Sequence, residues 1–346
     1  MKTFTSKIKI VYTSYRRTEL LCGSIASALK EFPFSNIYVY CDRWKNSQDR
    51  EAILRHYQAL KDEFGANKQV FLYMRKRNYG MFNAFDAIRS HLVDCPVLFL
   101  EDDLILKKGA GDFIRKYSKM YWNDPSISAL SLFNALSSRY VFSCPIKITR
   151  TWMWGTMLWP HKPKFLERIT LDEIKLLRSD AGIFAKVASY LGDEGLNLAI
   201  YDFYNKSFSA LDCRLAFRHA LYGFRSVAPP VNLVENFGFT GDGAHCPDSK
   251  AYAALFEDRQ SLDMDMWLGL EAKELTVRQE SLAGSLFLAP SDFSDDDLRR
   301  DWHSFVWPSL DSKSAYLLAY PFRLISYLLR PRLLVSKTIK KVASML

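Results

Sequence analysis

Apolar runs alternate with amphipathic stretches along the first third of the chain. Runs rich in β-branched and aromatic residues, typical of strands, lie at 7–15, 36–42, 69–75 and 96–103. Apolar residues with helical spacing lie at 19–32, 50–64 and 78–92. This alternation indicates βαβ units and a parallel sheet. The strands are almost entirely apolar, as expected when helices cover both faces of the sheet. An α/β fold with a mostly parallel sheet flanked by helices is therefore predicted.

Acidic side chains stand where two of these strands end. Asp42 closes the second run, and Glu101, Asp102 and Asp103 close the fourth. Three adjacent carboxylates repel one another and resist desolvation, so a cation or fixed hydrogen-bond donors would stabilise them. A solvated acidic turn is the alternative. Ligands of such sheets bind beyond the carboxyl ends of the strands, which favours a ligand site.

Composition places the chain among globular proteins. Of its 346 residues, 49% are apolar and 25% charged, which argues against disorder. The six cysteines form no CxxC pair, a pattern typical of reduced thiols and not of a disulfide framework or zinc site. The apolar run at the N-terminus is too short for a signal peptide or a membrane anchor. A cytoplasmic protein is expected.

Charge divides the chain into three segments. Residues 1–250 hold 35 basic and 25 acidic side chains, a net charge of +10. Residues 251–311 hold 5 and 13, a net charge of −8, and read as an acidic helical extension. Residues 312–346 hold 7 basic side chains and no acidic ones. Such blocks indicate different partners for different segments.

The usual nucleotide-binding and nucleophile motifs are absent. No GxGxxG follows the first strand, and the sequence contains neither GxxxxGK[ST] nor GxSxG. Nucleotide phosphates could instead be neutralised by a divalent metal, which takes carboxylate oxygens and often keeps phosphate oxygens and water as its other ligands.

Three ordered motifs carry a family resemblance. LEDDLIL, with NYG upstream and DPSISALSLFNA downstream, resembles the GT-A glycosyltransferases, especially the N-acetylglucosaminyltransferase I family and related bacterial glycosyltransferases. The resemblance runs from about residue 8 to residue 247. It implies the GT-A fold, a Rossmann-like fold of nucleotide-diphospho-sugar transferases, and a catalytic domain over residues 1–250.

The resemblance also implies roles for residues at the strand ends. Asp103 resembles the family's metal-binding aspartate, and Mn²⁺ or Mg²⁺ is the expected cofactor. Glu101 and Asp102 resemble contacts to the nucleoside and ribose. Further nucleotide contacts are implied for Arg16, Asp42 and Asn78, although the eukaryotic relative has histidine at the position of Asn78. An ordinary turn or cap is the alternative for Arg16 and Asn78.

A tryptophan-rich loop and a later aspartate have counterparts in the family. TWMWGTMLWP resembles the loop under the donor sugar, where Trp152 and Trp154 would stack on the sugar and Gly155 would allow close approach. Core packing is the alternative for either tryptophan. LDCRLAF resembles the segment whose aspartate, here Asp212, is the base of inverting enzymes, although Leu211 replaces the family's tryptophan. The nearby alternatives are Asp193, Glu194 and Asp202.

The stretch PPVNLVENFGFTGDGAHC resembles a bacterial motif whose histidine completes the metal and diphosphate site. His245 is therefore a candidate metal ligand. The glycines at 241 and 243 indicate a loop that closes over the donor.

The C-terminal tail, residues 312–346, is both apolar and basic. Arg323, Arg330 and two prolines interrupt it, so no stretch reaches the roughly 20 apolar residues that span a bilayer. A helix lying on an anionic membrane fits this pattern, and a packed C-terminal helix is the alternative. Nucleic acid fits poorly, because bulky aliphatic residues alternate with the cations.

Together these features predict a metal-dependent glycosyltransferase. The expected partners are a nucleotide-diphosphate sugar, with UDP as the nucleotide, a glycan or lipid-linked glycan acceptor, and an anionic membrane bound through the tail. The expected location is the inner face of the cell membrane, and the expected role is bacterial surface polysaccharide or glycolipid synthesis with inversion. A sugar nucleotidyltransferase and a non-catalytic membrane-associated partner in polysaccharide assembly are the rival interpretations.

Overall fold

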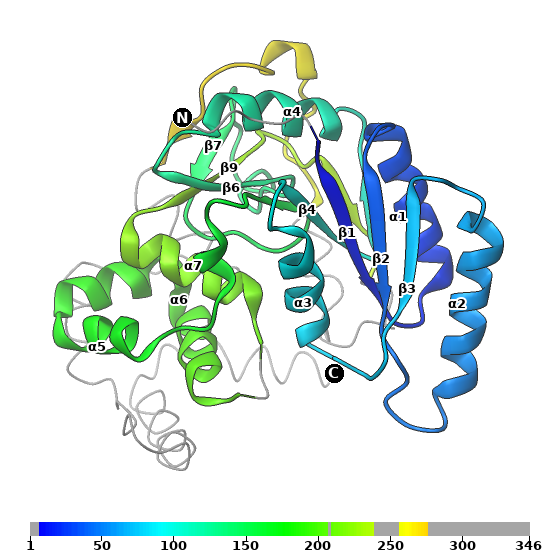
Figure 1. Cartoon of the computed structure of the whole chain (residues 1–346). Coiled ribbons are helices and arrows are strands. Elements are labelled where there is room, and N and C mark those ends of the chain that lie inside the picture. Colours follow the sequence, from blue (N-terminus) through cyan, green and yellow to red (C-terminus); the bar gives the residue numbers. More distant parts are fainter. Residues whose placement is uncertain (1–6, 207–208, 239–255, 276–346) are drawn as a thin grey trace, which may run out of the picture. The chain divides into compact units, whose positions relative to one another are not determined.

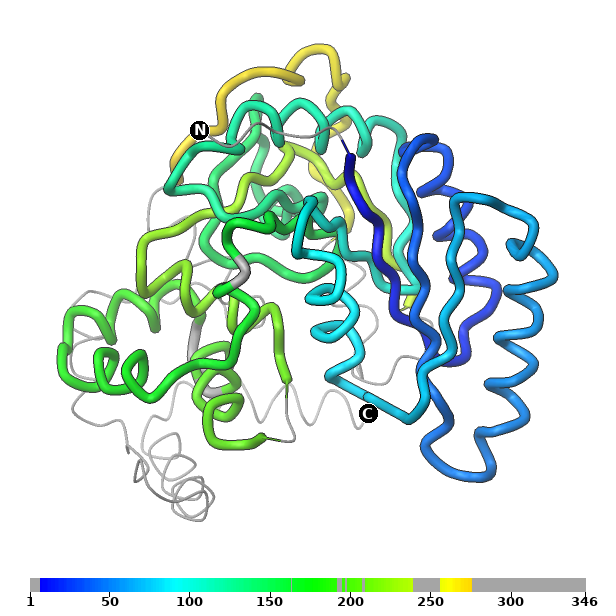
Figure 2. Tube along the Cα trace, in the orientation of Figure 1, coloured from blue at the N-terminus to red at the C-terminus, as the bar shows by residue number. Residues whose placement is uncertain are grey.

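The computed structural model describes residues 7–206, 209–238 and 256–275. These residues form two compact units, each described below by itself (Figures 1 and 2). The sheet unit holds the chain up to Glu167 and again from Tyr222 to Thr276. The helical unit includes Arg168–Leu221, which is inserted into the sequence of the sheet unit. The sequence pattern did not predict this division.

The first half of the sheet unit has the predicted elements. In chain order they are β1 (Lys9–Ser14), α1 (Thr18–Glu31), β2 (Asn36–Cys41), α2 (Arg50–Phe64), β3 (Val70–Met74), α3 (Phe82–His91) and β4 (Val97–Glu101). Strands β4, β1, β2 and β3 lie side by side and pair in parallel. Right-handed crossovers place α1 and α2 on one face of these strands and α3 on the other, as Figure 1 shows. All four strands therefore end at the same edge of the sheet.

The second half of the sheet is mixed. It contains β6 (Ile127–Ser131), β7 (Ile146–Ile148), β8 (Thr156–Leu158), β9 (Arg225–Ala228) and β11 (Lys273–Glu274). Over the residues that the structure describes, the sheet has nine strands in the order β11-β7-β9-β6-β8-β4-β1-β2-β3. Strand β8 runs antiparallel to both of its neighbours, β4 and β6. The predicted α/β class with a mostly parallel sheet flanked by helices is confirmed.

A small second sheet continues the chain beyond β4. Strand β5 (Leu104–Leu106) pairs antiparallel with β10 (Val234–Asn236). Asn236 lies opposite Leu104, so the residues after β10 lie beside the residues before β5. This pairing joins two segments that are far apart in the sequence.

Part of the predicted acidic extension packs on helix α4 (Ala110–Tyr121). The Tyr117 hydroxyl accepts a hydrogen bond from the backbone N–H of Gly269 at 2.9 Å, and Trp267 is buried against Phe113. The same segment forms a 3₁₀ turn at Met264–Met266 and strand β11, which joins the main sheet. Residues 256–275 thus belong to the sheet unit. The rest of 251–311 and the tail 312–346 lie outside the described residues, so the domain boundaries placed there stay predictions.

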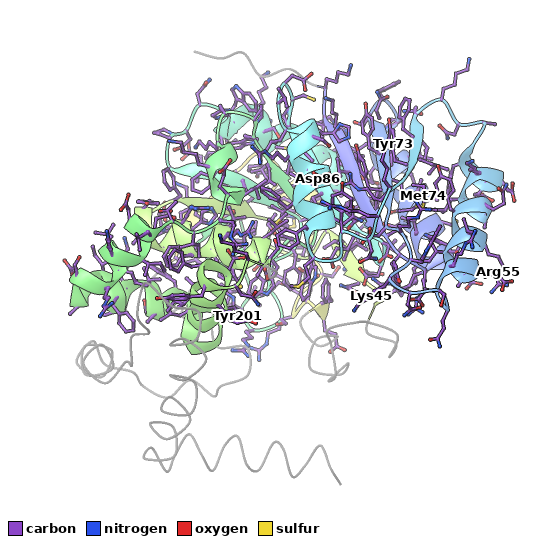
Figure 3. All side chains as sticks on the ribbon, turned by 60° about the horizontal axis from the view of Figure 1, so that its bottom comes forward. Lys45, Arg55, Tyr73, Met74, Asp86 and Tyr201 are labelled. Carbon is purple, nitrogen blue, oxygen red and sulfur yellow. The ribbon has the colours of Figure 1, made fainter. Side chains whose placement is uncertain are left out.

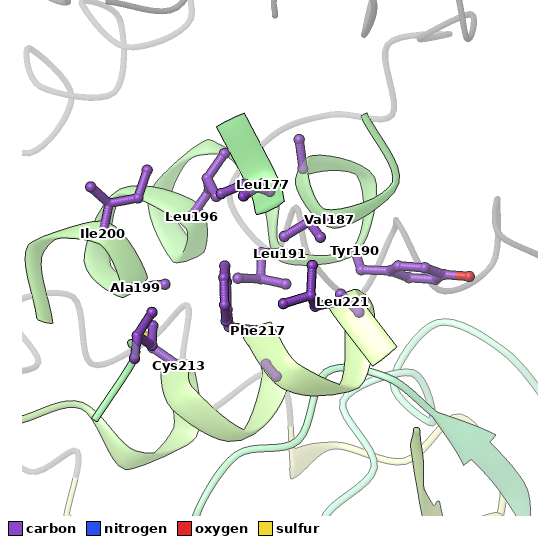
Figure 4. Close-up of a cluster of buried hydrophobic side chains, with 14 of the residues drawn as sticks. Leu177, Val187, Tyr190, Leu191, Leu196, Ala199, Ile200, Cys213, Phe217 and Leu221 are labelled. Atoms are coloured by element: carbon purple, nitrogen blue, oxygen red, sulfur yellow. The ribbon is translucent and has the colours of Figure 1, made fainter. Parts of the chain in front are cut away.

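The helical unit has its own core. Its described helices are α5 (Leu171–Ser179), α6 (Ala181–Tyr204) and α7 (Leu211–Tyr222). Their apolar faces meet in the buried cluster that Figure 4 shows, which includes Leu177, Leu191 and Phe217. Two buried ion pairs, Asp202–Arg214 and Glu173–Arg218, connect the helices. Among the helices that the structure describes, none is long and apolar enough to cross a membrane.

Candidate active site

The acidic triplet lies at the carboxyl end of β4. Glu101 is the last residue of the strand, opposite Thr13 of β1, and is partly exposed. Asp102 and Asp103 follow in the turn to β5, and they are only 4% and 6% exposed. Buried carboxylates are costly unless positive charge or hydrogen bonds stabilise them. Asp102 and Asp103 therefore do not belong to a solvated acidic turn.

Arg17 compensates both buried aspartates. It is the residue before α1, where the chain turns from β1 into the helix. Its guanidinium donates to Asp103 Oδ2 at 2.8 Å and also to Asp102 Oδ1. Burial nevertheless raises the pKa of Asp102 to about 6, with Arg17 opposing that effect, and raises the pKa of Asp103 as well. Arg17 therefore offsets only part of the negative charge of Asp102 and Asp103.

Asp103 is enclosed from the other side by the end of β10. Its backbone carbonyl accepts from the N–H of Phe237 at 2.9 Å. A Cβ atom built on Gly238 would lie 1.9 Å from Asp103 Oδ2, so a larger residue here would have to displace the Asp103 carboxylate. The structure therefore brings the first half of the stretch PPVNLVENFGFTGDGAHC to the triplet. His245, in its second half, lies outside the described residues.

The side chain of Asp103 fits a divalent cation. Its Oδ1 atom is buried and has no hydrogen-bond partner within the described part of the chain. An orphaned carboxylate oxygen is a natural ligand for a hard cation such as Mg²⁺ or Mn²⁺. The described residues contain no cluster of three or more His, Cys, Asp or Glu side chains placed to hold a metal. Phosphate oxygens and water are ligands that Mg²⁺ commonly keeps beside a single carboxylate.

A hydrogen-bonded chain of buried side chains supports Asp102. Ser14 Oγ, at the end of β1, lies 3.4 Å from Asp102 Oδ2 and 2.9 Å from His56 Nε2. His56 comes from α2 and is 2% exposed. Its other ring nitrogen, Nδ1, lies 2.7 Å from Thr18 Oγ1 at the start of α1. Strand β1 and helices α1 and α2 thus converge behind one carboxylate.

The direction of this chain follows from donor chemistry. An ionised Asp102 only accepts, so Ser14 must donate its single hydroxyl proton to it. Ser14 Oγ then accepts from His56 Nε2–H, and Nδ1 accepts from Thr18. This assignment requires a neutral imidazole, and burial lowers the pKa of His56 to about 4. The chain therefore holds the Asp102 carboxylate in one orientation.

Asp42 and Asn78 meet at the ends of β2 and β3. The Asp42 carboxylate accepts from the backbone N–H groups of Tyr79 and Gly80, each at 2.7 Å, and from that of Arg43 at 3.0 Å. Asn78 Nδ2 donates to the Arg43 carbonyl at 2.6 Å. Burial raises the pKa of Asp42 although these N–H groups oppose it. Asp42 fixes the loop after β3, and its predicted contact with a base stays a prediction.

Arg16 does not reach the triplet. Its guanidinium pairs with Asp49 at 3.0 Å, and 56% of its side chain is exposed. The neighbouring Arg17 makes the contacts to the carboxylates instead. The predicted nucleotide contact of Arg16 stays a prediction.

Trp152 and Trp154 lie in an aromatic cluster with Phe133. The Phe133 ring centre is 5.6 Å from that of Trp152 and 5.1 Å from that of Trp154, and Phe256 packs on the same group. Trp152 is 7% exposed, which matches the core-packing alternative, whereas Trp154 is partly exposed. Gly155 has a φ of +75°, and a Cβ there would lie 3.0 Å from Leu132. The loop thus needs glycine at this position for its backbone conformation.

Asp212 belongs to the helical unit, at the start of α7. It is partly exposed, and its Oδ1 accepts from the N–H of Cys213 at 2.9 Å. The alternative Asp202 is fully buried, and Arg214 binds both of its oxygens, so its carboxylate is not exposed to an acceptor hydroxyl. The side chains of Asp193 and Glu194 lie outside the described residues. Asp212 therefore stays the candidate base.

Sequence reasoning missed four residues of this site: Ser14, Arg17, His56 and Gly238. A signal existed for His56, because it lies on the apolar stripe of α2 with Ile53, Leu60 and Phe64. A polar residue on a core-facing stripe needs a buried partner. No comparable signal distinguishes Arg17 from Arg16.

Comparison with known proteins gives structural matches only. The chain matches no family model and no curated protein. It is similar to the mannosyltransferase PcManGT from Pyrobaculum calidifontis, which was solved with GDP-Man and Mn²⁺. The two chains are 14% identical, the match covers 97% of this chain and 87% of that chain, and the TM-score is 0.42. An active-site mutant of LgtC matches with 12% identity, 64% and 72% coverage and a TM-score of 0.31. The galactosyltransferase LgtC with donor and acceptor sugar analogs matches with 12% identity, the same coverage and a TM-score of 0.30.

Proposed function

We propose that this protein is a metal-dependent glycosyltransferase that moves a sugar from a nucleotide-diphosphate sugar to an acceptor hydroxyl. The observation that carries the proposal is the buried Oδ1 of Asp103 at the carboxyl end of β4, which has no hydrogen-bond partner among the described residues. The motifs LEDDLIL and VENFG, which resemble two separate parts of the GT-A site, adjoin at Asp103, through its backbone carbonyl and its Oδ2 atom. Fold alone would not establish activity, so the site must carry the assignment.

Each residue of the site has a defined task in this proposal. Asp103 would hold Mn²⁺ or Mg²⁺, which when bound offsets negative charge on the leaving diphosphate. Arg17 keeps Asp102 and Asp103 ionised and close together. Ser14 and His56 orient Asp102 toward the ribose. Glu101, Arg16, Asp42 and Asn78 would contact the nucleoside, and Trp154 with Gly155 would lie under the donor sugar.

The acceptor side of the reaction depends on Asp212. We place it as the general base that takes the proton of the acceptor hydroxyl as the new bond forms, which gives inversion. UDP is the proposed nucleotide, and the proposed product belongs to bacterial surface polysaccharide or glycolipid. His245 is proposed to complete the metal and diphosphate site. The tail 312–346 is proposed to hold the protein on the inner face of the cell membrane.

A panel of UDP- and GDP-sugars tests the function. The release of free nucleotide diphosphate is measured with and without Mn²⁺ for the wild-type protein, for Asp103→Asn and for a matched control, Asp112→Asn, whose carboxylate is exposed on α4. We expect metal-dependent release by the wild type and the control and loss of release in Asp103→Asn. A sugar nucleotidyltransferase would instead consume a sugar phosphate and release pyrophosphate. A non-catalytic partner would release nothing from any donor, and either result would refute the proposal.

A further inference from the structure

Cations gather on the two loops that follow β2 and β3. They are Arg43 and Lys45 on the first loop, Arg50 at the start of α2, and Lys76 and Arg77 on the second loop. The loops touch, because the Arg43 guanidinium donates to the Lys76 carbonyl at 2.9 Å. We call these five residues together with Trp44 the basic surface. It lies at the edge of the sheet where the strands end, and Lys45 is labelled in Figure 3.

The charge of the basic surface is not neutralised by the described residues. None of its five cations forms an ion pair within the described ranges, and all except Arg43 are exposed. The carboxylates nearby are already engaged: Asp49 binds Arg16, Glu51 binds Arg55, and Asp86 binds Arg75. Five neighbouring cations repel one another, and an anionic partner would relieve that repulsion.

Apolar groups lie among these cations. The indole of Trp44 has the guanidinium of Arg43 at 4.1 Å from its ring centre and that of Arg50 at 5.4 Å. Met81 is 40% exposed in the turn that follows Arg77 along the chain. Tryptophan next to lysine and arginine is the composition found at the boundary between membrane and water.

We propose that the basic surface docks the protein on an anionic lipid bilayer. Phosphate headgroups would pair with the five cations, and Trp44 would enter the headgroup boundary. Docking there would turn the strand-end edge of the sheet, with Asp42 and the acidic triplet, toward the lipid. This inference concerns described residues only, and it stands whether or not the proposed transferase activity is correct.

A bilayer fits this surface better than a nucleic acid does. Stacking on bases needs open aromatic faces, and two guanidinium groups already lie over the Trp44 ring. The ring of Tyr79 is likewise engaged, by Arg75 at 4.8 Å and Arg77 at 5.0 Å. Anionic headgroups need only the charges and a shallow apolar contact.

The test uses the full chain and two matched triple variants. One removes three cations of the basic surface, as Lys45→Gln, Lys76→Gln and Arg77→Gln. The control removes three exposed cations elsewhere on the sheet unit, as Lys68→Gln, Lys108→Gln and Lys119→Gln. Both variants lose the same net charge and keep the same tail, so the difference between them isolates the basic surface. Binding is measured by co-sedimentation with vesicles of equal parts phosphatidylglycerol and phosphatidylcholine.

A cation near an anionic surface contributes about 1 kcal/mol, or roughly fivefold in affinity, so the first variant should bind roughly a hundredfold more weakly. The control should stay within a few-fold of wild type. Equal binding by both variants, or an equal loss in both, would overturn the proposal. Competition by glycerol phosphate at the same anion concentration would show a site for free phosphate and not for a bilayer. If the first variant bound vesicles as well as wild type but had lost binding to single-stranded RNA, the surface would be assigned to nucleic acid instead.

Discussion

Replacing His56 by glutamine tests the buried chain behind Asp102. Glutamine can place an amide N–H near the position of Nε2, so the hydrogen bond to Ser14 is kept while the titratable ring is lost. Burial lowers the pKa of His56 from 6.5 to about 4 in the folded protein. Between these values the unfolded chain binds a proton that the folded protein excludes. The free energy of unfolding should therefore fall as the pH drops from 6.5 toward 4.

The size of this effect follows from the shift. A pKa difference between 6.5 and about 4 corresponds to roughly 3 kcal/mol of linked stability, because each pKa unit is about 1.4 kcal/mol. Most of that loss should be present at about pH 4.5 in the wild type and absent from His56→Gln. The variant should therefore be close to wild type near neutral pH and about 2 to 3 kcal/mol more stable than wild type in acid.

Urea unfolding followed by tryptophan fluorescence across this pH range measures the difference. His91→Gln is the matched control, since its pKa is also lowered to about 4 but its ring is only partly buried against Tyr38 and Tyr40. Solvent screening of this partly exposed ring should make the gain in free energy of unfolding in acid smaller for His91→Gln than for His56→Gln. Parallel stability curves for wild type and His56→Gln would refute a buried, neutral imidazole and with it the direction assigned to the hydrogen-bonded chain.

Three further substitutions test other parts of the structure. Arg214→Leu should lower the free energy of unfolding by roughly 3 to 5 kcal/mol, because it leaves Asp202 buried without its partner. The double variant Arg214→Leu with Asp202→Leu should recover much of that loss, and urea unfolding measures both. Asp212→Asn should reduce turnover by roughly a hundredfold with donor affinity unchanged in steady-state kinetics, and normal turnover would exclude it as the base. Gly238→Ala should press a methyl group into Asp103 and weaken metal-dependent donor binding by about tenfold or more in calorimetry, whereas unchanged binding would show that the contact relaxes.

The strands around the triplet could be predicted because their signals are local. Each apolar run is bounded by polar residues, and each amphipathic stretch has one buried face, so the order of elements up to β4 is confirmed. The position of Asp102 and Asp103 at a strand end follows from the same pattern. The rule that parallel strands end at one edge then brings Asp42 to the same side.

The parts that could not be predicted depend on contacts between distant segments. Arg16 and Arg17 are adjacent and identical in type, and only the start of α1 at Thr18 decides which one faces the carboxylates. Gly238 reaches Asp103 because β10 pairs with β5, a pairing between short strands that local pattern does not reveal. Strand β8 lies antiparallel between β4 and β6, and the alternation of strands and helices predicts only parallel pairs.

The helical insertion was missed for a different reason. No elements were predicted for residues 168–221, and helical periodicity indicates a buried face without showing what covers it. The structure shows that these helices bury their faces against one another and connect through Asp202–Arg214. Asp202 and Arg214 are twelve residues apart, and spacing alone does not specify that they pair.

Calorimetric titration of nucleotide sugars with and without Mn²⁺ tests the central claim most directly. The wild type and Asp112→Asn should bind a nucleotide-diphosphate sugar tightly only when the metal is present. Asp103→Asn should bind the donor weakly both with and without Mn²⁺. It should unfold at a urea concentration close to that of the wild type, because removing its charge leaves the fold intact. Binding of the donor and metal by Asp103→Asn as tight as that of the wild type would contradict the assignment of the triplet as the metal and nucleotide site.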